Sequence, residues 1–429
     1  QITALKYIAT FTKGKTIPQV MYILMDYLLP HIGEDNYIDK AYYLGFMVNK
    51  LLRVYYNEEK ATDRDNFKYK RVELPGNLIY DLFKEYYNLL QKEIQGHIEN
   101  DLYYHYTNTE TNYLNVTELQ LVSEVFSSEF IKDDKKDEKK KHKLGYNEIF
   151  KNKVVDNGFK KSYKGRWGAT PLTTRLGIIQ DLNRLSFNSF ISHLRKINLP
   201  LDESAKVVGP RLCHSSQYGI IDPMDTPDGG NCGLHKHLAI TSYITNGYSY
   251  KLLFEWLREN INVRLLEECI PENIINKTKI FINGTWIGIV NQLVSTVNFL
   301  KFARRIALIP IYTSISCDYI NNSIEIFTDG GRITRPLFYV DETRELSINS
   351  ELFKKSTGKT EHIDWFNIVS GFNTKKNKII LRNNSFYEMN ELYNDSIDTL
   401  NKNKSVVEYI DSSEMNTLLV SSSIDKIKY

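Results

Sequence analysis

Cysteine is scarce in this chain, whose 429 residues include only Cys213, Cys232, Cys269 and Cys317. Their spacing does not form a disulfide framework, which suits a reducing compartment. Long apolar runs are missing too, because no segment approaches the roughly 20 residues that a membrane-spanning helix needs. The N-terminal residues also lack the pattern of a signal peptide. We therefore expect an intracellular protein with no membrane partner.

Excess charge of either sign is missing as well, because 55 Lys and Arg residues face 52 Asp and Glu residues. The net charge of +3 excludes a globally basic nucleic-acid coat, so any contact with DNA or RNA must come from local patches. A phosphate-cradling loop is not indicated, since Gly330-Gly331-Arg332 lacks the required glycine spacing and a following helix. The chain starts at Gln1 rather than Met, so we expect a piece of a longer protein.

The length predicts several compact domains. Apolar residues recur at helical spacing through much of residues 1–110 and again over residues 176–194, which predicts helices there. Residues 132–143 (KDDKKDEKKKHK) contain no apolar residue. We interpret them as a solvated loop rather than a nucleic-acid tether, because the interleaved acids weaken the positive field.

Strand patterns predominate in the C-terminal half. A short helix is predicted at residues 252–258, and residues 279–290 predict a hairpin around Asn283-Gly284, a preferred dipeptide of tight turns. Other strands are predicted at residues 323–327, 334–340 and 417–421.

The densest cluster of turn-forming residues is DPMDTPDGGNCG, residues 222–233, which we call the Pro/Gly loop. Pro223 and Pro227 fix φ and remove backbone donors. The three glycines permit positive φ or the close approach of another backbone. These residues predict a rigid, shaped loop, and loops held on a scaffold often carry function.

A zinc site near the Pro/Gly loop is one alternative, since zinc favours thiolate and imidazole ligands. Its candidate ligands are Cys213, His214, Cys232, His235 and His237. The first two are adjacent and point in different directions, and Cys232-x-x-His235 has no second half-site. The spacing therefore disfavours zinc.

Asp222, Asp225 and Asp228 recur every three residues and could provide carboxylate ligands for Mg²⁺. We favour the alternative of turn chemistry, in which aspartate side chains accept nearby backbone N–H groups. A serine nucleophile is not indicated, because the two serines that follow His214 are too close in sequence to pair with it by themselves.

The Pro/Gly loop and its flanks resemble the fork region of the second-largest subunit of multisubunit DNA-dependent RNA polymerases. That family carries Arg-x-x-His-x-x-x-(Trp/Tyr)-Gly, then Pro-x-Glu-Thr-Pro-Glu-Gly, then Gly-Leu. The matching residues are Arg211, His214, Tyr218, Gly219, Pro223, Thr226, Pro227, Gly229, Gly233 and Leu234. Asp225 and Asp228 depart from this pattern, because each replaces a glutamate with a shorter acid.

The resemblance covers nearly the whole chain in the family order, and TPDGGNCGLHKHLAI is most similar to large-DNA-virus polymerases. The other matching segments are residues 63–83, 176–200, 281–289, 327–338 and 407–411. It implies an α+β, multi-domain fold with a helical lobe, a mixed fork region and two small α/β external domains. The implied domains are a lobe at 1–110, a protrusion remnant at 111–165 with the charged loop 132–143, a fork at 166–245, external domain 1 at 246–340 and part of external domain 2 at 341–429.

This resemblance implies a role in transcription. The chain would shape the active-centre cleft and guide DNA and the RNA–DNA hybrid during template-directed RNA synthesis. Implied partners are the largest and the smaller polymerase subunits, template DNA and the hybrid. The Mg²⁺ of the whole complex would be held mainly by the largest subunit, so this piece would contain no catalytic residue or cofactor and would be inactive alone. The implied location is the nucleus for a cellular polymerase, and host cytoplasm or virion for a viral one.

The expected nucleic-acid contacts are the basic residues around the fork. They are Arg184, Arg195, Lys196, Lys206, Arg211 and His214. The resemblance places them beside two loops, residues 168–174 near the hybrid and residues 201–210 near the downstream edge of the bubble. Such residues would neutralise phosphates and position strands rather than read bases. Asp225, Asp228 and Gly229 are expected to line the active centre.

Two alternatives from other classes remain open at this point. One is a non-catalytic nucleic-acid-binding scaffold, and the other is a metal-dependent hydrolase built on the Cys/His/Asp-rich loop.

Overall fold

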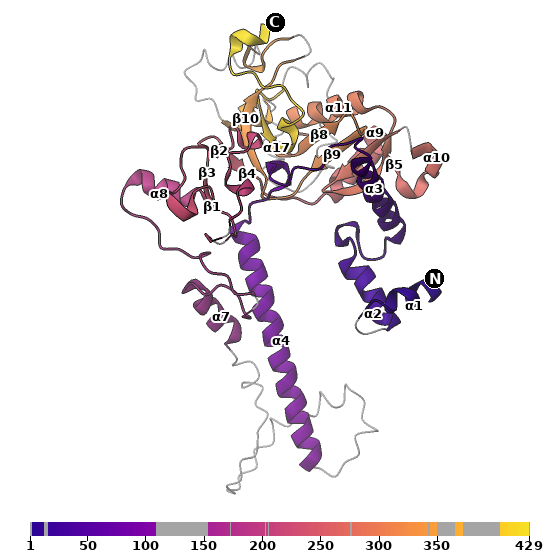
Figure 1. Ribbon diagram of the computed structural model, residues 1–429, viewed down its shortest axis with the longest axis vertical. Coiled ribbons are helices and arrows are strands. Elements are labelled where there is room, and N and C mark those ends of the chain that lie inside the picture. Colours follow the sequence, from indigo (N-terminus) through magenta and orange to yellow (C-terminus); the bar gives the residue numbers. More distant parts are fainter. Residues whose placement is uncertain are drawn as a thin grey trace. The chain divides into compact units, whose positions relative to one another are not determined.

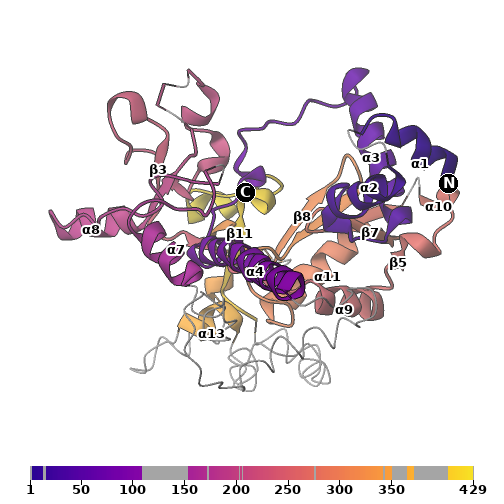
Figure 2. The ribbon, with the colours of Figure 1, turned by 90° about the horizontal axis from the view of Figure 1, so that it is seen from below.

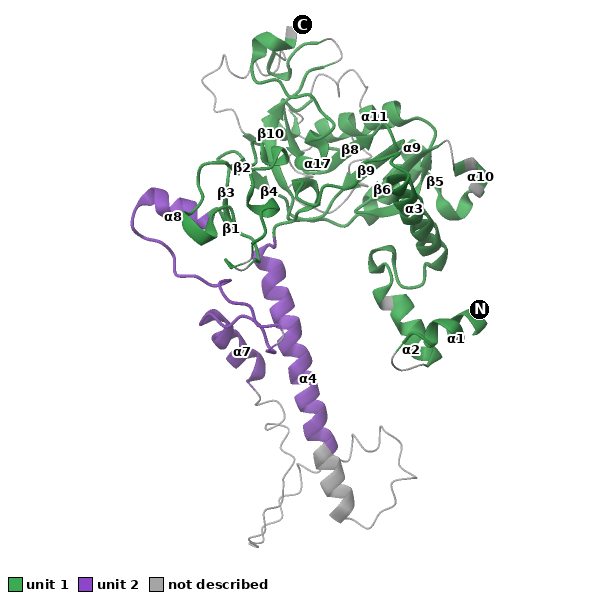
Figure 3. Ribbon diagram, in the orientation of Figure 1, with its two compact units in different colours: residues 1–72, 195–429 green, residues 73–194 purple. Residues whose placement is uncertain are grey.

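The computed structural model describes residues 2–12, 16–108, 153–171, 173–201, 203–204, 206–274, 277–341, 344–349, 365–371 and 404–428. These residues form two compact units, which Figure 3 distinguishes by colour. Unit 1 comprises residues 1–72 and 195–429, and unit 2 comprises residues 73–194. The charged run at 132–143 lies outside the described residues, and the finer division into five domains stays a prediction.

Unit 1 combines three sheets with helices, as Figure 1 shows. Its helices are α1 (Ile2–Ala9), α2 (Ile17–Tyr22), the π-helical η1 (Ile23–Tyr27), α3 (Tyr37–Tyr55), α9 (Lys251–Ile261), α10 (Pro271–Ile274), α11 (Leu293–Arg305), α13 (Trp365–Ser370) and α17 (Ser412–Met415). Its strands are β1 (Lys196–Asn198), β2 (Ile221–Asp222), β3 (His235–Leu238), β4 (Tyr243–Ile244), β5 (Arg264–Leu265), β6 (Thr278–Ile282), β7 (Thr285–Val290), β8 (Ser314–Asp318), β9 (Ser323–Phe327), β10 (Ile333–Phe338) and β11 (Val407–Asp411). The sheet orders are β1-β3-β2, β11-β10-β4 and β5-β7-β6-β9-β8. The predicted α+β class is confirmed.

The five-stranded sheet contains the predicted hairpin. Strands β6 and β7 pair antiparallel, and Asn283 and Gly284 between them have φ of 49° and 84°. Two successive positive φ values are the requirement of a type I′ turn, whose twist matches that of the strands. Strand β9, also predicted, pairs parallel with β6 and antiparallel with β8.

Helices cover both faces of this sheet. On one face, Ile280 and Ile282 of β6 pack with α9 and α11 in the largest apolar core. Between them in sequence, Phe281 points to the other face, as the two-residue period of a strand requires. There it joins Trp286 and Phe46, and Figures 1 and 2 both show α3 beside the sheet.

A smaller core joins three distant segments of unit 1. Ile220 and Ile333 are buried, and Phe67 and Val72 pack against them. The Val72 N–H also donates to the Gly331 carbonyl at 2.8 Å. This core fixes the base of the segment that carries the Pro/Gly loop.

Unit 2 is helical, with α4 (Pro75–Asn108), α7 (Val154–Tyr163) and α8 (Phe187–Leu194). Its core centres on the buried residues Leu82, Tyr86 and Trp167. Gly158 of α7 lies directly against the Tyr86 ring, which leaves no space for a larger side chain. The Tyr86 hydroxyl donates to the Gly168 carbonyl at 3.1 Å, so α4 also holds the segment after α7.

No helix among the described residues has the length and apolar character needed to cross a membrane.

The prediction of a helix across residues 176–194 is wrong for its first part. Only Phe187–Leu194 is helical. Gly177 has a φ of +80°, which interrupts a right-handed helix. Ser186 then starts α8, because its Oγ accepts the Ser189 N–H and the Ser189 Oγ accepts the Ser186 N–H.

The predicted strand at residues 417–421 is also wrong. Asp411 begins α17 instead, where its Oδ1 accepts the Glu414 N–H at 2.9 Å. Thr417 then donates its hydroxyl to the Glu414 carbonyl and ends that turn. Leu419 and Val420 beyond it are exposed, so they have no sheet face to fill.

Candidate nucleic-acid interface

The Pro/Gly loop connects β2 to β3 in the small sheet of unit 1. Strand β3 lies in the middle of this sheet and pairs antiparallel with both β1 and β2, so the loop leaves from an edge strand and returns in the central one. Thr226 closes it from inside, because its Oγ accepts the Gly233 N–H at 2.9 Å and donates to the His235 carbonyl at 3.1 Å. The predicted shaped loop is present.

Arg211 fixes one side of this loop. Its guanidinium donates to the backbone carbonyls of Gly230 at 2.5 Å, Cys232 at 2.9 Å and Glu203 at 3.2 Å. Gly233 permits this closeness, because a Cβ at that position would collide with the backbone of Arg211. The side chain therefore ties residues 203 and 230–232 together.

Arg195 has a similar role at the other end of β3. Its guanidinium donates to the Ala239 carbonyl at 2.5 Å and lies 3.4 Å from the Ile240 and Ser242 carbonyls. These three carbonyls belong to the turn that follows β3. A guanidinium suits this role because it presents several donors in a fixed plane.

His214 links two segments that are far apart in sequence. Its Nδ1 accepts the Ser216 backbone N–H at 3.1 Å, so the ring proton lies on Nε2, which donates to Asp63 Oδ2 at 2.7 Å. The Asp65 backbone N–H and the His214 ring hold the pKa of the Asp63 carboxyl below its ordinary value. His214 is therefore held by the segment at residues 63–67.

Ser216 completes this link. Its Oγ lies 2.7 Å from His214 Nδ1 and accepts the Phe67 N–H at 2.9 Å. The two residues thus contact each other despite their closeness in sequence, and with Asp63 they reproduce the contacts of a hydrolytic triad. Ser216 is buried, however, and its oxygen is bonded to the backbone, so the chain of contacts fastens two segments.

The other basic residues that were predicted to contact nucleic acid have different surroundings. Arg184 belongs to unit 2, where its guanidinium lies over the Phe190 ring at 4.8 Å and is exposed. Lys196 is half-buried opposite His237 in the small sheet, and burial together with the Lys196 and His237 charges lowers the pKa of His235. Lys206 is exposed in unit 1.

The three aspartates do not converge. Asp222 Oδ1 accepts the Met224 N–H at 2.9 Å, which is the predicted turn chemistry. Asp225 Oδ1 lies 3.3 Å from His237 Nδ1, and Asp228 is exposed just before the turn that starts at Gly229. Because these three carboxylates have separate partners or surroundings, they do not form a primary Mg²⁺ site.

The cysteines and histidines do not converge either. In the part of the chain that the structure describes, no group of three or more His, Cys, Asp or Glu side chains could hold a metal ion. The buried Lys236 lies close to both Cys213 and Cys232: burial lowers the pKa of its ammonium, and the two thiols act in the opposite direction. A neighbouring ammonium disfavours a cation at these thiols.

Two features were missed at the sequence level. Asp63 was recognised only as the first residue of the matching segment 63–83, and nothing in the sequence indicated that His214 was its partner. A row of cations on α7 was also missed, although the spacing of Lys160, Lys161 and Lys164 was a usable signal for one helix face.

Comparison with known proteins agrees with this arrangement. Three domain models match in chain order: RNA polymerase Rpb2 domain 2 at residues 4–73, domain 3 at residues 180–244 and domain 4 at residues 280–341. Domain 2 thus covers Asp63 and Phe67, and domain 3 covers their partners His214 and Ser216. The residues that fasten the two segments lie inside matched domains.

Full-length relatives give the same result. DNA-directed RNA polymerase II subunit RPB2 of Encephalitozoon cuniculi is 33% identical over 87% of this chain and 30% of its own length. DNA-directed RNA polymerase II subunit 2 of Arabidopsis thaliana is 31% identical over 86% of this chain and 29% of its own length. DNA-directed RNA polymerase subunit 2 of Acanthamoeba polyphaga mimivirus is 25% identical over 75% of this chain and 25% of its own length.

The two eukaryotic relatives are thus more similar than the viral one, which does not favour the virus-type interpretation. The chain spans about 30% of the length of the first two relatives. With three domain matches in order and about 30% identity over most of its residues, this chain belongs to the family of the second-largest subunit of DNA-directed RNA polymerases.

Proposed function

We propose that this chain is part of the second-largest subunit of a multisubunit DNA-dependent RNA polymerase. It shapes the active-centre cleft and guides DNA and the RNA–DNA hybrid during template-directed RNA synthesis. The observation that carries the proposal is the contact chain from Asp63 through His214 and Ser216 to Phe67, which joins two matched domains around the Pro/Gly loop. A loop fastened at several points can keep its shape while nucleic acid moves past it.

Within the predicted basic group, we propose a division of roles. The exposed cations Arg184 and Lys206 and the half-buried Lys196 neutralise backbone phosphates. Arg195 and Arg211 add positive charge and fix the shape of the loops, because their donors engage backbone carbonyls. His214 contributes through its link to Asp63.

The exposed residues Asp225, Asp228 and Gly229 line the active centre in this proposal. The catalytic Mg²⁺ ions of the complex are held mainly by the largest subunit in this proposal. Further partners are the smaller subunits, template DNA and the hybrid. The location is inside the cell, in the nucleus for a cellular polymerase and in host cytoplasm or the virion for a viral one.

Affinity purification tests this proposal. The gene that encodes the chain is tagged in its source, and the purified complex is incubated with a primed template and the four nucleoside triphosphates. We expect the tagged chain to purify with a largest polymerase subunit and with template-dependent RNA synthesis. A tagged chain that binds nucleic acid without RNA synthesis would indicate the scaffold alternative and refute the proposal.

The roles of Arg195 and Arg211 are tested in the same complex. Replacing both with Ala removes charge-assisted bonds to the backbone, each worth about 1.5–3 kcal/mol, so elongation should slow. Arg258→Ala is the control, because Arg258 belongs to helix α9 and forms an exposed ion pair with Glu268 rather than bonds to a loop backbone. Equal elongation rates for the double variant and the control, across salt concentrations, would contradict the assigned roles.

A further inference from the structure

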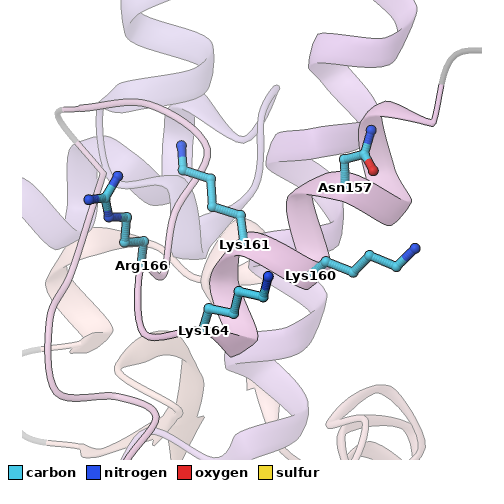
Figure 4. Close-up of a pocket in the computed structure, with 5 residues that line it drawn as sticks. All are labelled: Asn157, Lys160, Lys161, Lys164 and Arg166. Carbon is cyan, nitrogen blue, oxygen red and sulfur yellow. The ribbon is translucent and has the colours of Figure 1, made fainter.

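Unit 2 contains a groove of about 450 Å³ that is lined mainly by cations. Figure 4 shows Asn157, Lys160, Lys161 and Lys164 on or at the end of α7, and Arg166 on the segment that follows. Four of these five side chains are positive, and none of the described side chains that line the groove is acidic.

The packing of α7 explains why these cations share one face. Gly158 and Ser162, four residues apart, are buried on the opposite face, where Gly158 touches the Tyr86 ring of α4. The positions at 157, 160, 161 and 164 are spaced by three or four residues, so they align on the exposed face.

The segment after α7 is fixed as well. Gly165 turns the chain with a φ of +100°, and Trp167 anchors it in the core of unit 2. Arg166 lies between these two residues and is exposed. The groove therefore combines cations from a packed helix and from an anchored turn.

Stabilisation of α7 alone does not account for this many cations. A helix C-terminus carries roughly half a negative charge, and its effect is confined to the last turn. Lys160 and Lys161 lie in that turn, whereas Arg166 lies beyond the end of the helix. The positive charge of the groove exceeds what the helix end can neutralise.

Neighbouring acids do not neutralise the groove either. Lys160 pairs with Asp156 at 2.7 Å, four residues earlier on the exposed surface of α7, and such pairs are weak. Within the described ranges, no carboxylate lies at ion-pair distance from Lys161, Lys164 or Arg166. Among the described residues, these three charges therefore have no acidic partner that would compete with a ligand.

We propose that this groove binds the phosphodiester backbone of a nucleic-acid strand, a contact that rests on the proposed function. Flexible ammonium groups bind phosphates as point charges and require no base sequence. Arg166, which lines the groove, is followed after one residue by the loop at residues 168–174, and the Arg175 N–H closes this loop by donating to the Trp167 carbonyl at 2.7 Å. The strand would therefore run along α7 towards this loop.

Binding of a labelled RNA–DNA hybrid to the whole 429-residue chain tests the proposal. Fluorescence anisotropy is measured from about 50 to 200 mM salt for the wild type and for a groove variant that combines K160Q, K161Q, K164Q and R166Q. Each phosphate contact contributes about 0.7 to 0.9 to the slope of log affinity against log salt. Loss of four contacts should make that slope shallower by about 3.

A matched control variant combines K60Q, K84Q, K92Q and K251Q, which remove the same charge from exposed positions outside the groove. We expect its slope to change by less than about 1, the contribution of one contact. Equal slopes for the groove and control variants would overturn the proposal, because the effect would then come from total charge.

Two further measurements keep the proposal open to refutation if the groove variant folds poorly. D156N frees Lys160 from its only described acidic partner and should strengthen binding about twofold, which a folding defect would not do. A polyglutamate peptide of matched charge should displace the hybrid poorly. Equal displacement would mean a general dock for acidic proteins and would refute a nucleic-acid site.

These outcomes are separate from those of the proposed function. A tagged complex that synthesises RNA while the groove and control variants bind alike would leave the polymerase assignment intact and remove only the groove. A tagged complex without RNA synthesis would remove the polymerase assignment, whatever the groove binds.

Discussion

Two glycines in one loop provide a sharp test of how the Pro/Gly loop is built. Gly229 and Gly233 have nearly equal φ values, +77° and +74°. A Cβ at Gly229 would meet nothing within 4 Å, whereas a Cβ at Gly233 would collide with the backbone of Arg211. Gly229→Ala and Gly233→Ala therefore share the cost of a left-handed conformation and differ only in the collision.

The magnitudes follow from these two contributions. A left-handed conformation costs a residue with a Cβ about 1–2 kcal/mol, which both variants incur. Overpacking against a fixed group adds about 1–3 kcal/mol at Gly233 only. Arg211 cannot retreat easily, because its guanidinium is bonded to the Gly230 and Cys232 carbonyls. Gly233→Ala should therefore destabilise the loop by about 2–5 kcal/mol in total.

Hydrogen exchange of residues 226–238 measures this local stability. The Gly233 N–H is bonded to Thr226 Oγ and the Leu234 N–H to the Asn231 carbonyl, so both should be protected. Exchange in Gly233→Ala should be about 5- to 150-fold faster than in Gly229→Ala, the equivalent of 1–3 kcal/mol. Equal exchange in the two variants would refute the close approach of Arg211 and Gly233.

Three other predictions concern unit 1. In the wild type the Arg304 guanidinium bonds both carboxylate oxygens of the buried Glu414, at 2.7 and 2.9 Å. Arg304→Met removes these bonds, so the free energy of urea unfolding should fall by about 3–5 kcal/mol. The control Arg258→Met changes an exposed residue and should lower it by less than about 0.5 kcal/mol. Burial opposes the charge of Glu408, but the charges of Arg304 and Arg305 hold its pKa below the ordinary value of 4.5. Its contribution to the free energy of unfolding should therefore be complete above about pH 4.5 and be lost as the pH falls through the lower pKa of the folded state. An unfolding midpoint that is independent of pH from about 5 to 3 would contradict this. Asn283→Ala should lower the free energy of unfolding by about 2–3 kcal/mol in the same assay, because alanine is strained at a φ of 49° and two hydrogen bonds to Thr328 are lost. An unchanged midpoint would mean that the turn does not stabilise the hairpin.

Local chemistry made part of this fold predictable. The Asn283-Gly284 turn requires two positive φ values, which this dipeptide adopts readily, so the hairpin could be predicted from adjacent residues. The prediction of a helix over residues 176–186 was wrong. It followed the apolar spacing of this segment and gave too little weight to Gly177 and to the Ser186 cap. Apolar periodicity indicates which face would be buried and does not show that a helix forms.

The roles of the arginines could not be predicted for a different reason. Arg195 and Arg211 were recognised as basic residues near a loop, but the groups they contact are backbone carbonyls. Every residue has a carbonyl, so no sequence pattern marks the ones that an arginine will reach. Likewise, Asp63 and His214 are 151 residues apart, and only the fold brings them to 2.7 Å.

The residues that carry the family resemblance share a structural purpose. Arg211 and Thr226 bind the backbone of the Pro/Gly loop, and His214 holds the segment at residues 63–67. That segment continues to Arg71, whose Nε donates to the Asp329 carboxylate at 2.5 Å. The next residue, Val72, donates its N–H to the Gly331 carbonyl in the same turn. Three sequence motifs thus converge on one framework in which most polar groups bind each other. A motif of this kind preserves the shape of a loop, which agrees with the expectation that its residues are not the catalytic ones. It follows that Thr226→Ala, which removes two bonds inside the loop and no charge, should alter the stability of the loop, and under the proposed function should alter RNA synthesis only through that change.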